Sequence, residues 1–212
     1  MATTPSLTAF ERDTAVAPAG DGVWQATISD QWAVPRGPNG GYIAAIVLRA
    51  LQDAVGDADR APRSLTLHYL RPPVPGQPAT VEVTVERAGR SLTTLSARLV
   101  QDERPMVIAL AAFATTFPTA ADYATPPPGV GPPPDALDVF PYAPDLPPIA
   151  LQTATAPRFG SGPFNGGDEA VVGGWLRLAE PRIADAAAVA FYADAWLPSP
   201  FARLTAPAPA PT

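Results

Sequence analysis

The stretch RGPNGGYIAAIVLRAL, residues 36–51, joins a short polar loop to a helix with almost no polar face. Asn39 is a residue type that often caps a helix, and Gly40 and Gly41 follow it directly. Because a surface helix normally shows water a broad charged side, a helix that is apolar around most of its circumference must be enclosed. Two glycines at its start allow another group, such as a ligand, to approach its first amides closely. The stretch therefore predicts a buried helix over residues 40–55 with a close neighbour at its N-terminus.

The composition limits the sites and partners that we expect. The 212 residues include no cysteine and a single histidine, His68, which excludes thiolate and histidine-rich metal sites and leaves only carboxylate ligands for a metal. The net charge of −6 disfavours nucleic acid or an anionic membrane as the main partner, because both attract concentrated positive charge. The N-terminus has no basic and apolar regions of a secretory signal, and the longest apolar run is shorter than the ~20 residues that span a bilayer. We therefore expect a cytoplasmic protein that needs no metal or other cofactor.

Alternating apolar residues predict one strand before the helix and four strands after it. The first strand is expected in GVWQATISDQWAV, which begins at Gly22, and the others in RSLTLHYLR, ATVEVTVER, SLTTLSARLVQ and PMVIALAAFATTF. Since short turns separate these later strands, they must be largely antiparallel. A strand, an apolar helix and four antiparallel strands predict an α+β protein in which the sheet curves around a central helix. This arrangement is the hot-dog fold.

A proline-rich segment separates this unit from the rest of the chain. Ten of the 29 prolines lie between Pro126 and Pro148, and proline removes a ladder donor and favours extended backbone. We therefore expect a first hot-dog repeat over residues 20–118 and a linker over residues 119–170.

The region after the linker repeats the opening order of the first half. A strand beginning near Gly173 precedes a second apolar helix, which we expect to continue to Leu197. The four strands that would enclose this helix do not follow it before Thr212. Residues 171–212 are therefore expected to form an incomplete second repeat, and the whole chain a double hot-dog with its second repeat truncated.

The order and spacing of these segments resemble the acyl-CoA thioesterase II-like double hot-dog family, including its actinobacterial members. The matching stretches are GPNGGYIAAIVLRAL, RSLTLHYLRPPVPG, GRSLTTLSARLVQ with VIALAAF, and WLRLAEP followed by AFYADAWLP. They cover residues 20–118 and 172–200. The resemblance implies that two hot-dog repeats pack as a pseudo-dimer and that the protein hydrolyses acyl-coenzyme A in fatty acid metabolism.

The resemblance also implies that Asp194, in the segment YADAWLP, is the catalytic aspartate. The family's other two catalytic residues, a hydroxyl residue and a glutamine, come from strands that would lie beyond Thr212. Asp194 is also the only charged residue between Asp185 and Arg203. If it were buried, it would be a better base for water, because burial disfavours the charged form of a carboxylate. The alternative is a solvated aspartate near the C-terminal end of the second helix.

The start of the first helix offers a complementary group. The free amides at Asn39, Gly40 and Gly41 carry partial positive charge and could polarise the thioester or bind its developing oxyanion. The alternative is an ordinary asparagine cap, with the glycines needed only for close packing.

Two functions remain open from the sequence. The first is an acyl-CoA thioesterase in which Asp194 activates or anchors a water molecule and acyl-CoA is the partner. The second is a non-catalytic module that binds acyl groups or acts as a scaffold, which the missing strands favour. An incomplete repeat exposes a helix and a sheet edge, so we also expect a homo-oligomer.

Overall fold

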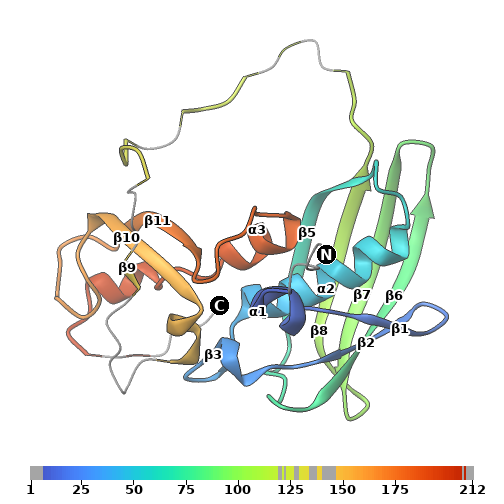
Figure 1. Cartoon of the computed structure of the whole chain (residues 1–212), viewed down its shortest axis with the longest axis horizontal. Coiled ribbons are helices and arrows are strands. Elements are labelled where there is room, and N and C mark those ends of the chain that lie inside the picture. The colour runs from blue at the N-terminus through green and yellow to red at the C-terminus, as the bar shows by residue number, and fades with distance from the viewer. Residues whose placement is uncertain are drawn as a thin grey trace, which may run out of the picture.

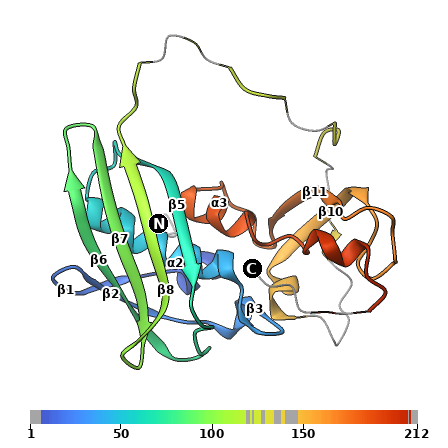
Figure 2. The ribbon, with the colours of Figure 1, turned by 180° about the vertical axis from the view of Figure 1, so that it is seen from behind.

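The protein contains a large curved sheet with a central helix and a smaller sheet beside it (Figures 1 and 2). The computed structural model describes residues 7–118, 121, 123–126, 129–133, 138–139, 147–206 and 208.

Helix α2, Gly40–Val55, is the centre of the first half and has the predicted bounds. The Asn39 side chain caps its start by accepting a hydrogen bond from the Tyr42 N–H. Its end is set by Gly56, whose left-handed φ of 61° suits a residue without a Cβ. Every residue from 41 to 48 is buried, so the helix is enclosed as predicted.

Six antiparallel strands form the sheet around α2 and confirm the predicted hot-dog arrangement (Figure 2). Their order across the sheet is β1 (Ala17–Gly20), β2 (Val23–Thr27), β6 (Pro78–Ala88), β7 (Leu92–Gln101), β8 (Arg104–Ala114) and β5 (Ala61–Tyr69). Alternate residues of the central strands, including Leu95, Leu99, Val107 and Phe113, have no exposed surface and share one core with α2. Strand β5 is an edge strand that pairs with β8 alone.

Strand β2 is shorter than the sequence predicted. It ends at Thr27, where the Ser29 side chain accepts a hydrogen bond from the Gln31 N–H and begins the short 3-10 helix η1 (Asp30–Trp32). A local serine cap competes with the ladder bonds of a strand, which ends the pairing. The hairpin β3 (Ala33–Val34) and β4 (Gly37–Pro38) then leads into α2.

The second half contains a three-stranded sheet in the order β11-β10-β9. Its strands are β9 (Asp138–Val139), β10 (Thr153–Gly160) and β11 (Val172–Leu178), with 3-10 helices η2 (Pro148–Leu151) and η3 (Ser199–Ala202). Strand β10 lies inside the range 119–170 predicted as a linker, so regular structure resumes earlier than expected. Residues 153–156 of this strand alternate between threonine and alanine and are buried. Their burial favours the strand although it contains Pro157, and the pairing with β11 becomes irregular next to this proline. Much of the range 119–146 lies outside the described residues.

Helix α3, Ala186–Tyr192, packs alongside α2 near the β5 edge (Figures 1 and 2). The sequence predicted this helix to continue to Leu197, but the chain turns at Ala193. Pro198 disfavours helical backbone at the residue before it, which shortens the helix from this side. The buried ring of Phe191 fixes α3 to the first half, with its centroid 5.2 Å from that of Trp32.

Charged residues join α3 to α2 and to the short N-terminal helix α1 (Ala9–Asp13). Arg182 contacts Asp185 at 2.9 Å and Glu11 at 3.5 Å, and Arg49 of α2 contacts Asp185 at 3.6 Å. Both guanidinium groups also lie over the ring of Phe10. The second half is therefore held to the first by an apolar contact and by a row of alternating charges.

Candidate functional site

Residues from both halves of the chain meet at the N-terminus of α2. Asp194 lies just beyond α3, and its Oδ2 accepts hydrogen bonds from Asn39 Nδ2 and from the Gly41 N–H, each at 3.0 Å. Asn39 Nδ2 also donates to the Asp194 carbonyl at 3.0 Å. The structure thus brings together the aspartate and the capped helix start that were predicted separately.

Asn39 has a second set of bonds that fixes its own position. It is 5% exposed, its Oδ1 accepts from the Tyr42 N–H at 3.0 Å, and its backbone N–H donates to the Trp32 carbonyl at 2.9 Å. The side chain is therefore an ordinary helix cap on one side and a donor to Asp194 on the other. The structure thus shows the helix cap, whereas the binding of a thioester or its oxyanion at these amides stays a prediction.

The two glycines are needed for a close approach to α2. A Cβ at Gly41 would lie 2.6 Å from the Phe191 carbonyl oxygen and 3.1 Å from the Asp194 Cβ. A Cβ at Gly40 would lie 2.9 Å from Asp194 Oδ2 and 3.1 Å from the Tyr69 hydroxyl. The neighbour predicted at the first amides is therefore the end of α3 and the turn after it, which belong to the chain itself.

Tyr69 is a member of the site that the sequence analysis missed. It is the last residue of β5, and its hydroxyl donates to the Gly40 carbonyl at 2.7 Å. Burial of the phenol and the negative charge of Asp194 raise the pKa of Tyr69 to about 12, so the hydroxyl stays protonated near neutral pH. The alternating pattern assigns Tyr69 to a strand, but no local signal shows that this strand ends at the start of α2.

Asp194 is exposed, which differs from the burial that the sequence analysis considered. The reason is that α3 ends before this residue, so that Asp194 lies in a turn covered on the α2 side. Oδ2 has two donors, whereas Oδ1 accepts from no group among the residues that the structure describes. One carboxylate oxygen is thus anchored, and the other has no hydrogen-bond donor among these residues.

The predicted amides of the helix start are not equally available. The Gly41 N–H already donates to Asp194, and the Tyr42 N–H donates to Asn39. In the described parts of the chain, the Gly40 N–H donates to no acceptor. Of the amides predicted at Asn39, Gly40 and Gly41, that of Gly40 is therefore the one without an acceptor among the described residues, and it lies beside the carboxylate.

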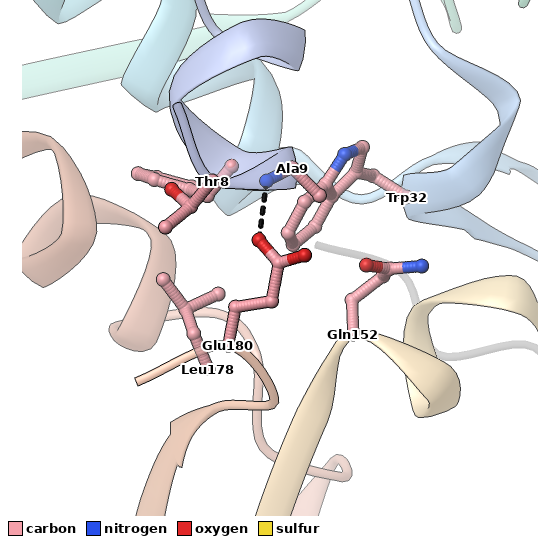
Figure 3. Close-up of a pocket in the computed structure, with 7 residues that line it drawn as sticks. Thr8, Ala9, Trp32, Gln152, Leu178 and Glu180 are labelled. Atoms are coloured by element: carbon pink, nitrogen blue, oxygen red, sulfur yellow. Dashed lines mark hydrogen bonds between the residues drawn. The ribbon is translucent and has the colours of Figure 1, made fainter. Parts of the chain in front are cut away.

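A separate hollow lies between α1, η1 and the second half (Figure 3). Its lining residues are Thr8, Ala9, Phe10, Trp32, Gln152, Leu178 and Glu180. The Ala9 N–H donates to Glu180 Oε2 at 2.6 Å across it. None of the predicted site residues lines this hollow, so we treat it as a seam between the two halves.

Two further observations concern metals and membranes. Among the described residues, no three histidine or acidic side chains are grouped as metal ligands would be. None of the helices that the structure describes combines the length and the apolar character needed to cross a membrane.

The sequence matches two family models. The model described as the acyl-CoA thioesterase N-terminal domain matches residues 28–114, and that described as the acyl-CoA thioesterase C-terminal domain matches residues 125–212. The first range contains Asn39 to Gly41 and the second contains Asp194. No curated protein matches the sequence.

Several solved structures share the fold. A conserved protein of unknown function with a hot dog fold from Alicyclobacillus acidocaldarius is 26% identical, with a TM-score of 0.81 over 96% of this chain and 75% of its own. A putative thioesterase II from Thermobifida fusca YX is 23% identical, with a TM-score of 0.75 over 94% of this chain and 76% of its own. An acyl-CoA thioesterase II from Mycobacterium marinum is 19% identical, with a TM-score of 0.65 over 88% and 68% of the two chains. These likenesses agree with the hot-dog fold.

Proposed function

The chain belongs to the acyl-CoA thioesterase family, and on this basis we propose that it hydrolyses an acyl-coenzyme A to a free acid and coenzyme A. The observation that carries the proposal is the anchored carboxylate of Asp194. Its Oδ2 is held by Asn39 and Gly41, while Oδ1 is free to accept a hydrogen bond from water. A carboxylate held in this way is suited to orient and deprotonate a water molecule.

In the proposed reaction, the water held by Asp194 Oδ1 attacks the acyl carbon. The water oxygen bonds to this carbon, its proton passes to Oδ1, and the electron pair of the carbonyl moves to its oxygen. When the carbonyl re-forms, the carbon–sulfur bond breaks, and the proton on Oδ1 passes to the departing thiolate of coenzyme A. No covalent intermediate with the protein is needed, because a thioester is already an activated acyl group.

The free N–H of Gly40 is the group proposed to stabilise the oxyanion. It is the first amide of α2, where the aligned peptides place partial positive charge. A donor aimed at a developing oxyanion contributes about 10²- to 10³-fold in rate in comparable sites. The same positive end of α2 also attracts the Asp194 carboxylate, so one helix terminus stabilises both the carboxylate and the proposed oxyanion.

The exposure of the site bears on how the protein assembles. Asp194 is exposed and β5 is an edge strand that leaves one side of its backbone unpaired. We propose that the protein is a homo-oligomer in the cytoplasm and that a second subunit covers this side, since unpaired edges favour association. The same exposure favours the alternative function, a non-catalytic acyl-binding or scaffold module.

The test is the release of free thiol from acyl-CoAs of several chain lengths by the purified chain. We expect Asp194→Asn to lower kcat by about 10²- to 10⁴-fold, the range for loss of a general base. Asp30→Asn removes an exposed charge away from the site and is the matched control. Equal rates for wild type and Asp194→Asn would exclude Asp194 as the base. Binding of acyl-CoA without release above buffer would favour the module.

A further inference from the structure

The peptide group between Gly40 and Gly41 is hydrogen-bonded at both of its ends. Tyr69 donates to the Gly40 carbonyl at 2.7 Å, and the Gly41 N–H donates to Asp194 Oδ2 at 3.0 Å. This carbonyl and this N–H belong to one planar, resonance-stabilised unit. A continuous path of two hydrogen bonds therefore runs from the Tyr69 phenol through the peptide to the carboxylate.

The two bonds in this path strengthen one another. A donor on the carbonyl oxygen draws electron density from the amide nitrogen, so that the N–H becomes a better donor. Cooperative strengthening of this kind is about 10–30% per bond in condensed phases. The acceptor here is a carboxylate, and charge-assisted bonds are the stronger class.

We propose that Tyr69 is a positioning residue of the hydrolytic site, acting on Asp194 through the Gly40–Gly41 peptide. It strengthens the bond to Oδ2 and so holds the carboxylate in the orientation in which Oδ1 faces the attacking water. The inference rests on the proposed thioesterase function. It adds a residue that contacts neither the water nor the proposed oxyanion.

The packing at Gly40 supports this assignment. A Cβ there would lie within 3.1 Å of both the Tyr69 hydroxyl and Asp194 Oδ2, so both side chains lie close to the Gly40 Cα. Tyr69 is also the ionisable group on β5 that interacts with Asp194. On α2, the Tyr42 hydroxyl is bonded instead to Ser29 and to the Asp13 carbonyl.

The ionisable groups of α3 are also directed elsewhere. Asp185 lies at the opposite end of this helix and pairs with Arg182 and Arg49. The Tyr192 hydroxyl accepts from the Leu178 N–H at 3.2 Å. Among these residues, Tyr69 is therefore the one whose hydroxyl reaches the peptide that is bonded to Asp194.

The direct test is the amide resonance of Gly41 in a proton–nitrogen NMR spectrum of the full chain. In Tyr69→Phe we expect the Gly41 proton to shift upfield, because its bond to the carboxylate weakens. Tyr192→Phe, which removes a phenol hydroxyl from the second half, should leave the Gly41 proton shift unchanged.

Kinetics supply the second readout. In Tyr69→Phe we expect kcat to fall about two- to fourfold, with KM changed less than twofold, because the carboxylate is held less firmly. Incorporation of 3-fluorotyrosine makes the phenol a stronger donor and should shift the Gly41 proton downfield. This variant keeps the hydroxyl and tests the path even if the phenylalanine variant folds poorly.

The outcomes separate the two proposals. An unchanged Gly41 resonance in Tyr69→Phe, or an upfield shift with fluorotyrosine, would overturn the role of Tyr69 whatever the enzyme assay shows. Loss of activity in Tyr69→Phe with an unchanged Gly41 signal would also overturn it, because the effect would not pass through this peptide. If Asp194→Asn hydrolyses acyl-CoA as fast as wild type, Asp194 is not the base, and the role of Tyr69 in catalysis fails with it. If wild type releases no thiol above buffer, the proposed function itself fails, whereas the Gly41 resonance still tests the path from Tyr69 to Asp194.

Discussion

Replacing Gly41 with alanine should separate the stability of the protein from the function of the site. The added Cβ would lie 2.6 Å from the Phe191 carbonyl oxygen, and backbone atoms cannot rotate away. To restore an ordinary contact of 3.4 Å, α3 must move by about 0.8 Å. The bond from the Gly41 N–H to Asp194 would then lengthen from 3.0 Å to about 3.8 Å, beyond the range of a hydrogen bond.

The two energy terms of this substitution oppose each other. Alanine is favoured over glycine in a helix by about 0.8–1.0 kcal/mol, whereas overpacking costs about 1–3 kcal/mol. We therefore expect the free energy of unfolding in urea to fall by no more than about 2 kcal/mol, while thiol release falls at least tenfold because the carboxylate loses its anchor. Gly129→Ala, where a Cβ meets nothing within 4 Å, is the control. Full activity of Gly41→Ala would show that Asp194 does not depend on this close contact.

Three other substitutions test the contacts around the site. Asn39→Ala removes a helix cap and both side-chain bonds to Asp194. The free energy of unfolding, measured by urea titration, should fall by about 1–2 kcal/mol, and the rate of thiol release should fall tenfold or more. Phe191→Ala empties a fully buried position and should cost about 3–5 kcal/mol by urea unfolding, and a cost below 1 kcal/mol would contradict the packing of α3 described above. Burial tends to raise the pKa of Asp185, but hydrogen bonds from Arg182 and a backbone N–H outweigh it and lower the pKa below 3.8. This residue therefore stabilises the fold fully above pH 3.8 and loses that contribution as the pH falls through its lowered pKa. Asp185→Asn should make the free energy of unfolding less dependent on pH between pH 5 and pH 2. An unchanged dependence on pH would contradict the contact between Asp185 and Arg182.

The parts of the fold that local chemistry determines were predictable from the sequence. Helix α2 begins after Asn39 and ends before Gly56, and each of these residues acts through the backbone next to it. The strands after α2 follow from alternation, because one face of each packs on the same helix. Strand β10 was missed because it consists largely of small residues, contains Pro157 and follows a proline-rich segment, although its pairing with β11 outweighs these features.

The candidate site was predictable only in part. Asp194 was chosen through the family resemblance, and Asn39, Gly40 and Gly41 through the chemistry of helix ends. That these residues touch depends on the packing of α3 across more than 150 residues of sequence, which no local pattern encodes. For the same reason, the contact of Tyr69 with Gly40 was missed, and the sequence could not decide between a buried and a solvated Asp194.

The alternating row Glu11, Arg182, Asp185 and Arg49 has a consequence for handling this protein. Through this row, the tilt of α3 and the orientation of the Asp194 carboxylate depend on α1, a helix of five residues close to the start of the chain. A fusion tag or a shortened N-terminus that disturbs this small helix would act on the carboxylate from a distance, and high salt would weaken the same connection. Catalytic assays of tagged material should therefore be repeated after the tag is removed.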